Sequence, residues 1–121
     1  MPLILAIDDR EDNLITLRAL LNQHFDDAEI VTCLSPRDGL EKAEEILPDL
    51  VIVDYIMPEM DGIEVCRLLR GNIITSTIPI ILVTASDTTS GKRIAGLEAG
   101  ADAFLTKPVD DAELAAQVKS M

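Results

Sequence analysis

Three carboxylates, a hydroxyl and an ammonium group stand at the ends of apolar runs in this sequence. Asp8 and Asp9 follow the first run, and Asp54 follows a later one, while Thr84 and Lys107 hold the same place after two others. Carboxylates gathered in one place repel one another, so their pKa values must rise or a cation must lie among them. An all-oxygen ligand set suits magnesium, and the lack of a His or Cys cluster argues against zinc.

These residue types fit the chemistry of phosphoryl transfer. With a metal ion among the carboxylates, Asp54 can act as a nucleophile toward phosphorus, because aspartate forms acyl phosphates. The ion and the Lys107 ammonium would stabilise charge on the phosphoryl oxygens, and the Thr84 hydroxyl would donate a hydrogen bond. Each residue alone also fits a solvated loop or a strand end, so the prediction depends on their joint placement.

The apolar runs themselves have the length and composition of buried strands. Continuous runs of Ile, Leu and Val are typical of parallel strands that are covered by helices on both faces. The clearest strand candidates are residues 3–7, 50–53 and 78–83, and weaker ones are 29–33 and 103–106.

Helical patterns with recognisable starts lie between the strand candidates. Ser35, Asp61 and Asp110 are each placed to cap a helix, and an acidic residue follows three positions later. Pro48 and Gly71 mark the ends of the second and third helices. The alternation of strands and helices predicts a parallel sheet with right-handed crossovers, in which ligands bind beyond the carboxyl ends of the strands.

The fourth helical pattern, residues 88–99, contains two glycines. Gly91 and Gly96 each cost about 1 kcal/mol relative to alanine inside a helix. We therefore expect this helix to be the least stable, and conformational switching to be expressed there and on the face that it shares with the last helix.

The composition indicates one compact domain, residues 1–121, rich in aliphatic residues and poor in aromatic ones. A net charge of −12 makes direct binding to nucleic acid unfavourable. No apolar run is long enough for a signal peptide core or a membrane span, so we expect a cytoplasmic protein without membrane contact. Cys33 and Cys66 have no ligand or redox spacing and are expected to be plain packing residues.

Four motifs together resemble the response-regulator receiver family, and the resemblance covers all 121 residues. They are Ile7-Asp8-Asp9, the run Asp-Tyr-Ile-Met-Pro-Glu-Met-Asp-Gly at 54–62, Val83-Thr84-Ala85, and Lys107-Pro108. The resemblance implies a flavodoxin-like doubly wound α/β fold, (βα)5, with a parallel sheet in the order 2-1-3-4-5.

The resemblance also implies roles for the site residues. Asp54 would accept a phosphoryl group from a phosphohistidine, and Mg²⁺ would be the cofactor. Asp9, Asp54 and the Ile56 backbone carbonyl would ligate the ion, and Asp8 would orient its bound water. Phe104 stands where the family has an aromatic switch residue that moves with Thr84, although phenylalanine offers no hydroxyl.

Further expectations come from the same resemblance. The Lys107–Pro108 bond is expected to be cis, and the residues flanking the phosphoryl site would be Met57, Ala85, Ser86 and Pro108. The implied partners are a sensor histidine kinase or phosphotransfer protein and an output domain or downstream protein. The face formed by helix 4, strand 5 and helix 5 could also form a homodimer, and the domain could be a piece of a longer multidomain protein.

Two other functions fit the same residues less well. A small aspartyl-phosphate phosphatase needs a second acid two positions after its nucleophile, and Ile56 occupies that place. A flavodoxin-like cofactor binder would need Ser, Thr or Gly after the first strand instead of Asp8 and Asp9. The alternative that remains is an interaction module of the same fold that never carries phosphate.

Overall fold

The computed structural model describes residues 2–85 and 90–121 as five parallel strands alternating with five helices. The strand order is β2-β1-β3-β4-β5, as the resemblance implied. The strands are β1 Leu3–Ile7, β2 Glu29–Cys33, β3 Leu50–Asp54, β4 Ile80–Thr84 and β5 Ala103–Thr106. The helices are α1 Glu11–His24, α2 Pro36–Ile46, α3 Gly62–Gly71, α4 Ser90–Ala99 and α5 Asp111–Lys119.

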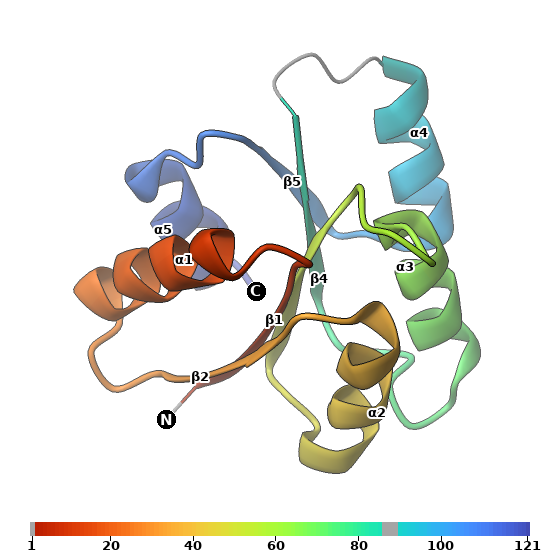
Figure 1. Cartoon of the computed structure of the whole chain (residues 1–121), viewed down its shortest axis with the longest axis horizontal. Helices are drawn as coiled ribbons and strands as arrows, with labels where there is room; N and C mark the ends of the chain where they lie inside the picture. Colours follow the sequence, from red (N-terminus) through yellow and green to blue (C-terminus); the bar gives the residue numbers. More distant parts are fainter. Residues whose placement is uncertain (1, 86–89) are drawn as a thin grey trace.

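The sheet is the middle of three layers. Helices α1 and α5 cover one face, and α2, α3 and α4 cover the other (Figure 1). Side chains alternate between the two faces of a strand, so each strand contributes to two cores. Leu5, Val53 and Leu82 belong to the core beneath α2, α3 and α4, whereas Ile52 and Ile81 belong to the core beneath α1 and α5. Because both faces of the central strands are buried, their sequences are unbroken apolar runs.

The predicted strands agree closely with the observed ones. Three match at both ends, and β3 is one residue longer because Asp54 itself belongs to the strand. Strand β4 begins at Ile80, two residues later than predicted, and ends at Thr84. Pro79 immediately precedes it and lacks the amide hydrogen that a ladder residue donates, which accounts for the later start.

The predicted helix starts are also confirmed. The side chains of Ser35, Asp61 and Asp110 accept hydrogen bonds from backbone amides in the first turns of α2, α3 and α5. In the described part of the chain α4 runs from Ser90, and the earlier part of the predicted helix, residues 88–89, lies outside the described residues.

Two further sequence predictions concern the cysteines and the apolar segments. Cys33 and Cys66 are both buried and free, as expected of packing residues. Among the described residues, no helix combines the length and the apolar character that a membrane crossing requires.

Candidate functional site

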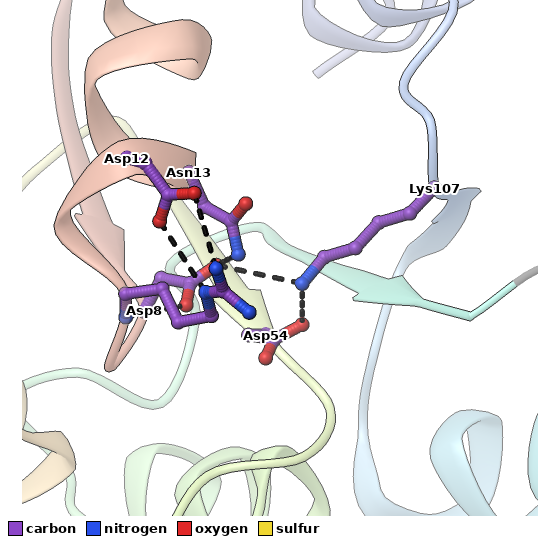
Figure 2. Close-up of polar contacts among 6 residues, drawn as sticks. Asp8, Asp12, Asn13, Asp54 and Lys107 are labelled. Atoms are coloured by element: carbon purple, nitrogen blue, oxygen red, sulfur yellow. Dashed lines mark hydrogen bonds and ion pairs between the residues drawn. The ribbon is translucent and has the colours of Figure 1, made fainter.

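The carboxyl edge of the sheet brings the predicted site residues to the ends of neighbouring strands. Asp8 and Asp9 follow β1, Asp54 ends β3, Thr84 ends β4, and Lys107 follows β5. Because β1, β3, β4 and β5 are consecutive in the sheet, segments far apart in the sequence meet at one edge. Figure 2 shows the Lys107 side chain reaching across to Asp54 and Asp8.

The three carboxylates form one cluster. One oxygen from each of Asp8, Asp9 and Asp54 lies within 4.8 Å of the other two. Asp8 and Asp54 are buried, with 6% and 7% of their surface exposed, whereas Asp9 is exposed. Three hard oxygen ligands with one side open to solvent fit a magnesium ion that keeps several waters.

Lys107 supplies the positive charge nearest to the cluster. Its Nζ lies 2.8 Å from Asp54 Oδ1 and 3.6 Å from Asp8 Oδ2. Burial raises the pKa of Asp54 above the ordinary aspartate value; Asp8 adds to this shift and Lys107 opposes it. Burial alone would lower the pKa of Lys107, but its contacts with Asp54 and Asp8 outweigh that effect and raise it. The ammonium therefore stays charged beside the carboxylates.

Asp8 is held in place by the start of α1. Its Oδ1 accepts a hydrogen bond of 3.0 Å from the Arg10 backbone amide, and its Oδ2 accepts one of 3.1 Å from Asn13 Nδ2 (Figure 2). Asn13 was not predicted from the sequence. The available signal was its position in the first turn of the helix that follows the acidic pair. Asp12, in contrast, pairs with Arg10 at 3.2 Å in solvent.

Thr84 lies on β4, and Phe104 lies on β5, the strand that Lys107 follows. Thr84 is buried at the end of β4, and its carbonyl oxygen accepts a hydrogen bond of 2.8 Å from the Lys107 amide. Phe104 lies opposite Leu82 in the β4–β5 ladder and is partly buried. The two proposed switch residues are thus on adjacent strands, and Phe104 contacts α4 as well as the sheet.

The residues expected to flank the phosphoryl site differ in exposure. Ile56 is 63% exposed although it is apolar, and Met57 is buried in the core beneath α2, α3 and α4. Ala85 and Pro108 are exposed, and the Lys107–Pro108 bond is cis as expected. Ser86 lies outside the described residues.

A hollow of about 230 Å³ adjoins the carboxylate cluster. Asp8, Asp54 and Lys107 line it together with apolar side chains from α1 and from the loop after β5, among them Leu17 and Val109. Sequence reasoning did not predict this hollow, because it forms between two elements that are distant in the chain. It offers an apolar contact surface directly beside the reactive groups.

Comparison with known proteins identifies the class. The family model described as "Response regulator receiver domain" matches residues 4–119. The response regulator PleD of Caulobacter vibrioides is 44% identical over 118 residues, which are 98% of this chain and 25% of that protein. The alkaline phosphatase synthesis transcriptional regulatory protein PhoP of Bacillus subtilis is 38% identical over 98% of this chain and 47% of its own length.

Solved structures agree with this assignment. The receiver domain of a signal transduction histidine kinase from Syntrophus aciditrophicus has a TM-score of 0.87 and 34% identity, covering 99% of this chain and 89% of that one. A Vibrio cholerae chemotaxis protein has a TM-score of 0.90 and 27% identity, covering 99% and 98%.

The chain therefore belongs to the response regulator receiver domain family, the signalling domains of two-component systems. Phosphorylation and magnesium binding are general features of this family. The chain spans about a quarter to a half of the length of the curated relatives described above.

Proposed function

We propose that this domain is the phosphoryl acceptor of a two-component pathway and that Asp54 is the residue modified. The donor would be the phosphohistidine of a sensor histidine kinase or a phosphotransfer protein. The observation that carries the proposal is the Lys107 ammonium, 2.8 Å from the buried Asp54 carboxylate inside a three-carboxylate cluster. The same cluster without a charged donor beside it would be a weaker candidate for phosphoryl chemistry.

The reaction is a direct displacement at phosphorus. An Asp54 carboxylate oxygen forms the new bond to phosphorus, and the bond from phosphorus to the donor imidazole nitrogen breaks. The electron pair of that bond stays on the imidazole. Lys107 Nζ moves its interaction from the carboxylate toward the phosphoryl oxygens, and the Thr84 hydroxyl donates a hydrogen bond to one of them. These residues position and stabilise charge, and the domain assists its own phosphorylation and dephosphorylation instead of acting on a separate substrate.

Asp9, Asp54 and the Ile56 backbone carbonyl would hold Mg²⁺, with Asp8 orienting its water. When bound, the ion offsets the negative charge of the carboxylates and the phosphoryl group. Asp8 suits an orienting role, because Arg10 and Asn13 already fix both of its oxygens.

The proposed output surface is the face formed by α4, β5 and α5. Thr84 and Phe104 connect the phosphoryl site to this face through the β4–β5 ladder. An output domain or a downstream protein would read the change there, and the same face could pair two copies of the domain. We place this activity in the cytoplasm, where free, buried thiols such as Cys33 and Cys66 are ordinary.

The decisive test is covalent modification. The domain is incubated with Mg²⁺ and acetyl phosphate, and its intact mass is measured. We expect a gain of one phosphoryl group that disappears in Asp54→Asn and when the metal is chelated. Asp26→Asn, an exposed aspartate between α1 and β2, serves as the matched control and should be modified normally.

Two results would contradict the proposal. An Asp54→Asn variant that still gains the group would move the acceptor elsewhere. A wild-type domain that binds Mg²⁺ but is modified neither by acetyl phosphate nor by a panel of phosphorylated histidine kinases would favour the phosphorylation-independent interaction module.

A further inference from the structure

The outer edge of the sheet at β2 is open. β2 is a terminal strand, and its inward bonds run from the Glu29 amide to the Pro2 carbonyl and from the Asp8 amide to the Cys33 carbonyl. Backbone groups of successive strand residues point to opposite edges, so those of Ile30 and Thr32 face away from β1. No strand among the described residues pairs with that side.

A groove of about 880 Å³ lies between α1 and α2 at the end of β2, where Thr32 and Cys33 line it. The end of β2 contributes Thr32, and Leu34 follows it, while Leu14 and Ile15 come from α1. Ile15 and Leu34 are 63% and 52% exposed, so both offer apolar surface to the groove. The groove thus combines outward-facing backbone groups with apolar side chains, the two features that hold an added strand.

The walls of the groove are mainly acidic. Its lining includes four carboxylates against two cations. Lys42 lies 3.4 Å from Glu45, which is one of the four carboxylates, and Arg18 donates to the Ile30 carbonyl at 3.3 Å. The four carboxylates, all on exposed residues, are Glu11, Asp38, Glu41 and Glu45.

We propose that this groove docks a basic, extended segment of a partner protein, which pairs with the open edge of β2. A second copy of this domain is a poorer occupant, because it would bring the same carboxylates against their like. In a strand that alternates lysine with an aliphatic residue, successive side chains point to opposite faces. The lysines can then pair with the groove carboxylates, and the aliphatic side chains can pack against its apolar residues. The docking site uses neither Asp54 nor Lys107, so it stands independently of the proposed function.

In this proposal Arg18 covers part of the β2 edge until a partner strand displaces it. Its guanidinium also lies 3.4 Å from the Thr32 hydroxyl, so it blocks part of the edge in the free domain. Charged side chains at an open edge limit unspecific strand pairing. A partner strand must displace Arg18 from the Ile30 carbonyl, and Arg18→Ala should therefore bind the same strand more tightly.

The test uses three synthetic peptides and calorimetry at low and high salt. The first alternates lysine and valine, the second has glutamate in place of lysine, and the third is the lysine peptide with alternate amides methylated so that one edge cannot pair. We expect the first to bind at low salt, and the other two to bind about tenfold more weakly or worse. Hydrogen exchange should show new protection at the Ile30 and Thr32 amides.

Matched charge variants separate the groove from net charge. Glu41→Lys with Glu45→Lys should weaken the lysine peptide by about tenfold or more. Glu98→Lys with Glu113→Lys makes the same charge change on exposed residues of α4 and α5 and should leave binding nearly unchanged. Melting temperatures of both variants are measured to show that they fold.

Several outcomes would overturn the proposal. They are no binding of the lysine peptide, equal binding of the methylated peptide, equal losses in both charge variants, and protection that maps away from β2. Dimerisation of the domain through β2 would also overturn it, since a second copy would then be the occupant.

Discussion

Lys107 sits among the carboxylates where a metal ion would also have to act. Its ammonium lies 2.8 Å from Asp54 Oδ1 and 3.6 Å from Asp8 Oδ2, so before any ion binds it neutralises part of their charge. The same ammonium is the nearest donor for an incoming phosphoryl group. Lys107 should therefore oppose metal binding and favour the reaction, two effects that one substitution can separate.

Replacing Lys107 with methionine should change the two measurements in opposite directions. Loss of a competing charge a few ångströms from the ligands should tighten Mg²⁺ binding by about tenfold. Loss of the donor should slow phosphorylation by acetyl phosphate by about a hundredfold. Calorimetry and timed intact-mass measurements give the two values, and Lys119→Met, in the last turn of α5, controls for net charge. Parallel changes in both quantities would contradict this account.

Ile56 raises a question of phosphoryl lifetime. Its side chain is 63% exposed and cannot hydrogen-bond a water molecule that attacks the phosphoryl group. We expect Ile56→Asn to shorten the half-life of the phosphorylated domain by about tenfold, which corresponds to about 1.4 kcal/mol of barrier. Ile56→Val keeps the side chain apolar and should leave the half-life unchanged. Equal decay of all three proteins would show that this position does not orient water.

The reactive residues could be predicted individually because each ends an apolar run. Asp8, Asp54 and Lys107 could be predicted without knowing where their side chains point, because the carboxyl ends of parallel strands lie at the same edge of the sheet. Asn13 could not be predicted in this way, because its contact with Asp8 depends on how the first turn of α1 is oriented. The exposure of Ile56 and the burial of Met57 likewise depend on the path of the loop after β3.

Gly96 in α4 has a packing role that its sequence context did not reveal. A methyl group at Gly96 would come within 2.3 Å of the Phe104 Cζ atom and 3.1 Å of the Leu82 Cδ1 atom. The Phe104 ring therefore occupies the space that the missing side chain leaves, and Arg93 lies 5.8 Å from the centre of the ring. The glycine that was expected to weaken the helix also makes room for the proposed switch residue.

Gly96→Ala should consequently destabilise the domain despite its better helix propensity. The gain of about 1 kcal/mol in propensity is outweighed by overpacking of about 1 to 3 kcal/mol against Phe104. Phe104→Leu in the same background should recover most of the loss, as measured by urea denaturation. Gly71→Ala is the control, since nothing lies within 4 Å of the added methyl group there. A Gly96→Ala domain as stable as wild type would mean that the ring moves aside freely.

Local signals predicted most elements well and failed where tertiary contact decided the outcome. Caps such as Ser35 and Asp61 act within one turn, so the sequence alone locates them. The start of β4 depended on Pro79, and the sequence could have indicated it. The packing role of Gly96 could not be predicted, because it depends on a contact between α4 and β5.

The burial of Asp54 links the stability of the domain to pH. Its pKa is raised in the folded state, so the folded domain holds this proton more tightly than the unfolded chain does. The contribution of Asp54 to the unfolding free energy is therefore largest at low pH. It falls as the pH rises from the ordinary aspartate pKa through the raised value.

Comparison with Asp54→Asn isolates this effect. Without metal, the unfolding free energy of the wild type should fall relative to the variant as pH increases above about 4, by at most about 1.4 kcal/mol per pH unit. Urea denaturation across this range gives the difference. Parallel profiles would show that Asp54 is no harder to ionise in the folded domain.

The three-layer architecture followed from the apolar patterns, because unbroken strand runs require helices on both faces. The strand order did not follow from those patterns and came from the resemblance to receiver domains. The groove at β2 could not be predicted, since it forms from residues of α1, β2 and α2 whose spacing in the chain carries no common signal.

The position of β3 in the middle of the sheet has a mechanical consequence. Asp54 is the last residue of a strand that is bonded to β1 on one side and to β4 on the other, with a helical layer above and below. Its backbone is therefore anchored from both sides at this edge. Any rearrangement triggered at Asp54 should then leave the backbone of the nucleophile nearly in place and be carried by neighbouring side chains, such as those of Thr84 and Phe104.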